Sequence, residues 1–233
     1  AFFSSLVGYV VIGVFLVLLG LVLWVFPDSS LLNYNYATLD TLFAMAPIIF
    51  MFLIPAITMR SFAEENQTGT IELLATRPLN DIEIILGKFF ANLLLLFFAL
   101  IPTLLYYYTI YDLGSPRGNL DSGGIMGSYI GLFLLGGAFT AIGLFASSLS
   151  KNQITAFILA TFLCFFIHYA FFYLSKMPLF VGRIDDIVQK IGMEYHYLSI
   201  SRGLIDTRDV VYFLTVITFF LGCTQVSLGS RKW

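Results

Sequence analysis

The chain has 233 residues, of which 59 % are hydrophobic, 17 % are aromatic and only 11 % are charged. Soluble domains carry about 25 % charged residues. The mean hydropathy of +0.90 therefore excludes an ordinary soluble enzyme and a disordered protein. The formal net charge of −2 provides no basic field for nucleic acid. The remaining fold class is an all-α polytopic membrane protein.

Six apolar runs are each long enough to cross a bilayer core, which takes roughly 20 helical residues. None of them contains Asp, Glu, Lys or Arg. We predict one transmembrane domain over residues 1–233, with a cytoplasmic loop at 60–81 and an outer helical loop at 176–209. The six spans are expected at approximately 6–26, 41–59, 89–111, 125–149, 154–175 and 210–228. The fourth contains Gly127-x-x-x-Gly131, a small-residue spacing that favours close packing of helices.

The beginning of the chain is not read as a signal peptide, because it has neither a charged leader nor a small-residue cleavage site. It starts at Ala1 and enters the first span almost at once. We therefore expect a short N-terminal segment to precede it. Cys164 and Cys223 both lie inside apolar runs, which argues against a disulfide framework.

Loop charge orients the predicted bundle. Six spans place both termini on one side, and basic residues divide six against six between the two sides. Five of those on the far side lie in the long loop 176–209, and the remaining loops divide six against one. The positive-inside rule counts short loops. It therefore places both termini and the 60–81 loop in the cytoplasm.

His168 is the only ionisable residue of the predicted spans and is a candidate intramembrane polar site. The alternative is a neutral imidazole that is hydrogen-bonded to a neighbouring helix. With no carboxylate in any span, we do not expect the chain to harness an ion gradient alone. It also lacks the G-x-x-x-x-G-K-[ST] loop that cradles ATP phosphates, and we predict no metal site. Energy for active transport would then enter from outside the bilayer.

The predicted 60–81 loop contains signals for a short helix of its own. Gly69 ends the helix that leaves the membrane, Thr70 can cap a new one, and Glu72 suits its first turn. Pro78 ends it. A helix of two turns needs a partner surface to be stable. Its acidic residues disfavour anionic headgroups, so a protein partner is preferred over a position on the lipid surface.

This loop carries a resemblance to a known family. The pattern Glu65-x-x-x-Gly69-Thr70-x-Glu72-x-Leu74-x-x-x-Pro78 resembles the signature of ABC-2 type transporter permeases. The resemblance implies that these six residues belong to a coupling helix, which docks on a separate ABC ATPase subunit. ATP and Mg would be bound by that ATPase, with no cofactor in this chain. Pairing with a second copy or a related permease subunit, in the bacterial inner membrane, is also implied.

Further segments resemble the GldF-like branch, the permeases of the gliding-motility ABC transporter of Bacteroidetes-type bacteria. They are residues 53–62, 127–132 and 201–209. The resemblance covers nearly the whole chain and implies a role in gliding motility. The branch normally begins with a basic amphipathic helix before the first span. A helix of this kind is consistent with the short N-terminal segment that we expect before Ala1.

The outer loop leaves two other functions open. An apolar stripe predicts a helix that lies at the outer interface or caps the bundle. An interfacial membrane enzyme acting on lipid would have its only candidate groups here, and a passive channel or anchor is the third hypothesis. The stripe consists of Ile184, Ile187, Val188 and Ile191, and the candidate enzyme groups are Asp185, Asp186, Glu194 and His196.

Overall fold

A computed structural model describes residues 6–27, 30–31, 37–69, 80–178, 182, 184–203 and 205–230. All regular structure in this part of the chain is helical. The described helices are α1 (Leu6–Gly20) with a π-helical continuation (Leu21–Val25), α2 (Asp40–Thr58), α3 (Arg60–Thr68), α5 (Asp81–Leu100), α6 (Leu104–Leu113), α7 (Ser122–Leu149), α8 (Gln153–Phe165), α9 (Phe171–Ser175), α10 (Asp185–Ile191), α11 (Met193–Ser201) and α12 (Thr207–Gly229).

Six helical stretches within the described residues are long and apolar enough to cross a membrane. The all-α class with six spans is thereby confirmed. Several helices extend beyond the apolar runs that predicted them. The third, for example, begins at Asp81 rather than near residue 89 and continues through a short 3₁₀ turn at Pro102 to Leu113. Uncharged residues mark only the part of a helix that lies in hydrocarbon.

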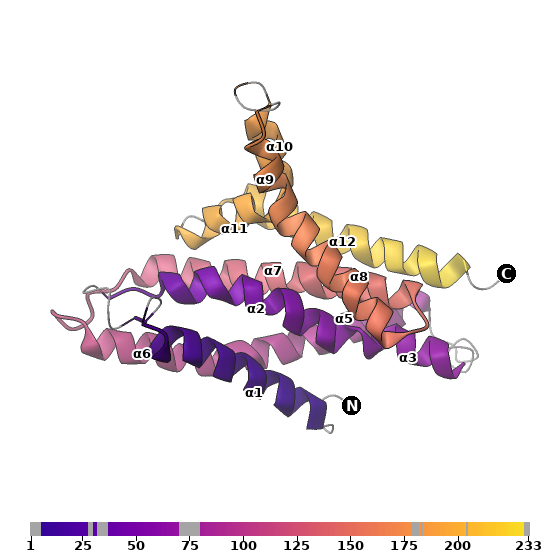
Figure 1. Cartoon of the computed structure of the whole chain (residues 1–233), viewed down its shortest axis with the longest axis horizontal. Helices are drawn as coiled ribbons and strands as arrows, with labels where there is room; N and C mark the ends of the chain where they lie inside the picture. The colour runs from indigo at the N-terminus through magenta and orange to yellow at the C-terminus, as the bar shows by residue number, and fades with distance from the viewer. Residues whose placement is uncertain are drawn as a thin grey trace.

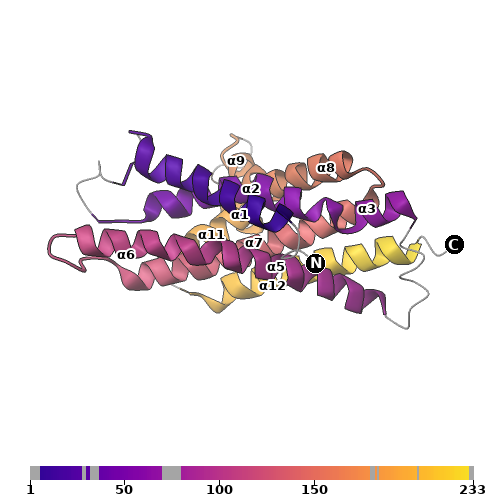
Figure 2. The same ribbon diagram turned by 90° about the horizontal axis from the view of Figure 1, so that it is seen from below.

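The spans α1, α2, α5, α7 and α12 run roughly along the long axis of the molecule (Figures 1 and 2). We call one end the α3 end. It holds α3, the start of α5 and the ends of α7 and α12, whereas α1 begins nearer the middle of the molecule (Figure 1). The opposite end holds α6 and α11 and is called the α11 end. The span α8–α9 leans away from the others, with α10 near its tip (Figure 1).

The central helix is α7, which contacts α2, α3, α5, α8, α11 and α12. Small residues allow this close packing. A Cβ atom at Gly136 would lie 2.3 Å from Leu96 Cδ2, and one at Gly127 would lie 2.9 Å from the carbonyl oxygen of Ile200. Gly131 of the predicted Gly127-x-x-x-Gly131 pattern also faces Ile200. The pattern therefore packs α7 against α11.

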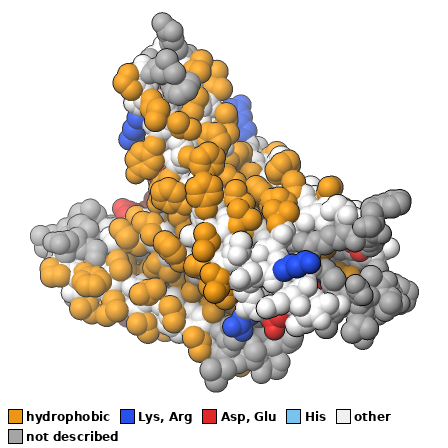
Figure 3. All heavy atoms as spheres, turned by 45° about the vertical axis from the view of Figure 1, so that its right-hand side comes forward, with side chains coloured by type: hydrophobic (Ala, Val, Ile, Leu, Met, Phe, Trp, Pro, Cys, Tyr) orange, Lys and Arg blue, Asp and Glu red, His pale blue; other side chains and the backbone are white. Residues whose placement is uncertain are grey.

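The outward faces of the spans are apolar. Ile158 and Phe162 of α8 are 61 % and 59 % exposed, and Val226 of α12 is 72 % exposed. Hydrophobic side chains cover much of the face shown in Figure 3, with few charged groups among them. Such a surface suits lipid rather than water.

Candidate functional site

The α3 end holds the residues that the sequence singled out. Glu65 and Gly69 lie in the described part of the chain, whereas Thr70, Glu72, Leu74 and Pro78 lie outside the described residues. Gly69 has φ +70°, in the left-handed region, and ends α3. Glycine reaches that conformation without steric cost. The expected helix end at Gly69 is confirmed.

The next helix starts at Asn80, as the sequence predicted. The carboxylate of Glu83 accepts a hydrogen bond of 3.0 Å from the backbone N–H of Asn80. The Asn80 side chain in turn accepts from the backbone of Glu83, which completes a capping box. Segment 70–79 is therefore flanked by two defined helix ends.

An ion pair joins the two helices that flank this segment. Lys88 Nζ of α5 lies 2.5 Å from Glu65 Oε1 of α3, and their side chains are 20 % and 27 % exposed. Lys88 also donates to the carbonyl oxygen of Ser61 and lies 4.4 Å from the ring centroid of Phe62. The ammonium thus combines an ion pair with a cation–π contact. It ties α3 and α5 together on both sides of the segment.

The sequence analysis did not single out Lys88. It stands just before an uncharged run of the third span, where it counted only as a loop charge. Its partner lies 23 residues earlier, so no helical spacing relates the two. A cation at the edge of an apolar run is the one local signal that could have drawn attention to it.

His168 lies inside the fifth span, in a π-helical turn between α8 and α9 (Phe166–Ala170). It is 2 % exposed, and the ring of Phe139 packs edge-on at 5.8 Å between centroids. Its Nδ1 has no hydrogen-bond partner in the described residues. π-Helical turns are frequent at functional sites, and His168 stays a candidate polar site.

The candidate enzyme groups at the α11 end serve structural contacts. His196 Nδ1 lies 2.6 Å from Asp209 Oδ1, and Nε2 donates to the carbonyl oxygen of Lys190 at 2.8 Å. Tyr212 stacks on the imidazole at 3.8 Å between centroids. Both ring nitrogens are therefore occupied. Asp209, which sequence reasoning missed, lies 13 residues from His196, and only folding brings the two together.

The remaining acidic candidates do not join His196 in a common centre. Asp185 and Asp186 lie in the first turn of α10, where their negative charges interact favourably with the helix dipole. Burial raises the pKa of Glu194, while the charge of Lys176 acts in the opposite direction. Among the described residues, no group of three or more His, Cys, Asp or Glu is placed to hold a metal ion.

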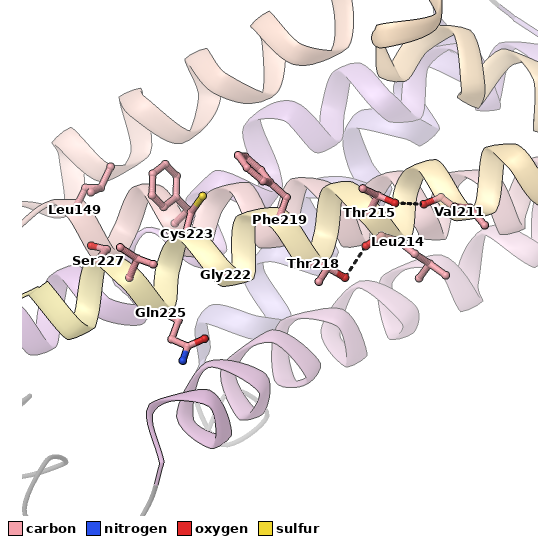
Figure 4. A pocket seen from close by; sticks show the side chains of 12 residues that line it. Leu149, Val211, Leu214, Thr215, Thr218, Phe219, Gly222, Cys223, Gln225 and Ser227 are labelled. Carbon is pink, nitrogen blue, oxygen red and sulfur yellow. Dashed lines mark hydrogen bonds between the residues drawn. The ribbon is translucent and has the colours of Figure 1, made fainter.

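A large groove runs along α12 beside the end of α7, with a cavity volume of about 1020 Å³. Its lining is apolar apart from a few uncharged polar side chains (Figure 4). The hydroxyls of Thr215 and Thr218 donate to the carbonyl oxygens of Val211 and Leu214 within α12. These hydroxyls are satisfied inside their own helix, so the groove presents a surface that acyl chains can cover.

The fold and its apolar exterior define a multi-pass helical membrane protein. The family model described as ABC-2 family transporter protein matches residues 24–193, more than half of the chain. The chain therefore belongs to the ABC-2 transporter family, as a membrane component. No curated protein matches it.

Proposed function

We propose that this chain is the permease subunit of an ABC-2 transporter and that segment 70–78 docks on a separate ABC ATPase. The observation that carries the proposal is the arrangement of α3 and α5. Both helices end in defined caps at this segment, and the Glu65–Lys88 pair links them. A push on the segment would reach both helices together. The family match supports a partner ATPase, since ABC-2 membrane components pair with one.

The proposal places the α3 end and both chain termini in the cytoplasm of a bacterium, with the chain in the inner membrane. The distribution of basic residues over the short loops supports this orientation. ATP and Mg would be bound by the partner, and closure of the ATPases would shift the helix bundle between two states. A second permease copy or a related subunit would complete the complex.

The particular process we propose is gliding motility. It rests on the resemblance of residues 53–62, 127–132 and 201–209 to the GldF-like branch. An ABC complex in that process would convert ATP hydrolysis into transport or mechanical work across the inner membrane. No observation in the described structure favours a lipid-modifying enzyme, because the nitrogens of His196 are already engaged.

Docking can be tested by reversing one charge in the segment. Glu72→Lys should reduce the amount of ABC ATPase that co-purifies with the permease from its native host by about tenfold, because a docking contact of about 1.4 kcal/mol changes binding tenfold. Asp186→Lys makes the same charge change on an exposed residue of α10, near the tip of α8–α9 and away from the α3 end, and should leave co-purification unchanged. Undiminished ATPase association in Glu72→Lys would contradict the docking proposal.

A further inference from the structure

Ser147 lies near the end of α7 and is fully buried. Its hydroxyl makes three hydrogen bonds to the backbone of a different part of the chain. It donates to the carbonyl oxygen of Met59 at 2.9 Å and accepts from the N–H groups of Phe62 at 2.9 Å and Ala63 at 3.0 Å. A serine hydroxyl offers one donor and two acceptor positions. The whole capacity of Ser147 is therefore used on the joint between α2 and α3.

This joint lacks a cap of its own. Met59 separates α2 from α3 and supplies no side-chain hydrogen bond to the new helix. Phe62 and Ala63 belong to the first turn of α3, where backbone N–H groups have no partner within the helix. Ser147 thus fills the role of an N-cap, although it comes from another helix.

Two neighbouring contacts hold α7 against the two sides of this joint. A Cβ atom at Gly143 would lie 2.1 Å from Thr58 Oγ1, so α7 and α2 approach very closely at the end of α2. Farther along, Asn66 Nδ2 donates to the carbonyl oxygen of Ser150 at 3.1 Å. Gly143 and Ser147 lie four residues apart on one face of α7, and Ser150 is its C-cap. This face of α7 follows the joint and the helix beyond it.

We propose that Ser147 is a positioning residue that fixes the angle between α2 and α3 and makes α3 move together with α7. Its importance for transport rests on the proposed function, in which α3 leads into the segment that docks the ATPase. A displacement of that segment then passes into α7, the central helix of the bundle. Without the Ser147 hydroxyl, the same displacement bends the chain at Met59 instead.

The direct test is hydrogen–deuterium exchange of the full chain in lipid nanodiscs, resolved to single amides. In Ser147→Ala, the amides of Phe62 and Ala63 should exchange about tenfold faster, because their acceptor is gone. Exchange in α8 and α12 should stay unchanged, which separates a local effect from general destabilisation. Thr140→Val is the matched control, since Thr140 is a buried α7 hydroxyl that bonds to Gly136 in its own helix.

Unchanged exchange at Phe62 and Ala63 in Ser147→Ala would overturn the proposal. If that variant does not fold, the unmodified chain still decides the matter. Its Phe62 and Ala63 amides must be as well protected as the interior of α7, and rapid exchange there would equally overturn the proposal.

A second readout separates this inference from the docking proposal. The ABC ATPase that co-purifies from the native host should remain bound to Ser147→Ala, because segment 70–78 is intact. The change in α7 exchange that ATP causes in the unmodified complex should be lost. A nucleotide response of normal size in Ser147→Ala would overturn the positioning role. Failure of the ATPase to bind the unmodified chain would instead refute the proposed function.

Discussion

The two ends of the bundle use the same kind of side chain for different purposes. At the α3 end, the Ser147 hydroxyl of α7 holds the backbone of a helix that leads away from the spans. At the α11 end, the Ser128 hydroxyl of α7 donates to the carbonyl oxygen of Ser201 in α11, a helix that turns back onto the bundle. One helix therefore anchors a backbone segment at each of its ends.

The Glu65–Lys88 ion pair at the α3 end and the His196–Asp209 hydrogen bond at the α11 end differ in burial. The Lys88–Glu65 side chains are 20 % and 27 % exposed, whereas those of His196 and Asp209 are 12 % and 6 % exposed. Solvent screens the first pair more than the second. The His196–Asp209 pair is therefore one whose loss leaves a buried polar group without a partner, while the Glu65–Lys88 pair is a more exposed link beside the segment that we propose to move.

The largest effect is expected at the α11 end. Asp209→Ala removes the carboxylate that faces His196 Nδ1 and leaves a buried polar ring without its partner. The free energy of unfolding should fall by about 3–5 kcal/mol, as for other buried pairs from which one partner is removed. Denaturant unfolding in detergent micelles measures this. Asp186→Ala, at an exposed acid of α10, should change stability by less than about 0.5 kcal/mol, and an equal loss in both variants would refute the assignment.

An intermediate effect is expected where α7 meets the α2–α3 joint. Gly143→Ala would place a Cβ atom 2.1 Å from Thr58 Oγ1, and such overpacking costs about 1–3 kcal/mol. Gly222→Ala in α12 is the matched control, because no atom lies within 4 Å of a Cβ built there. That variant should be neutral or more stable by up to about 1 kcal/mol, since alanine favours helix. A tolerated Gly143→Ala would show that the joint is looser than described.

The smallest effect is expected for the pair at the α3 end. Lys88→Met keeps an apolar stem over Phe62 but removes the ion pair with Glu65. Because both side chains reach solvent, stability should fall by about 1 kcal/mol or less. The same unfolding experiment measures this, and a double-mutant cycle with Glu65→Gln isolates the pair. A loss as large as that of Asp209→Ala would remove the proposed contrast between the ends.

Local rules predicted the features that depend on neighbouring residues. The helix end at Gly69 and the capping box of Asn80 and Glu83 follow from side chains within four positions of each other. The small-residue pattern at Gly127 and Gly131 indicated close packing, and the structure identifies α11 as the partner. The pattern itself holds no information on which helix lies opposite, because every span is apolar.

The amino-acid sequence by itself determined the six spans. Uncharged runs of that length lie in hydrocarbon, where the backbone N–H and C=O groups must hydrogen-bond to each other, and a helix achieves this within one segment. Tertiary structure decided which polar groups meet. Glu65 and Lys88 are 23 residues apart, and Ser147 lies more than 80 residues from the joint that it caps. Such contacts depend on how helices pack against one another, and no periodicity within a single helix encodes them.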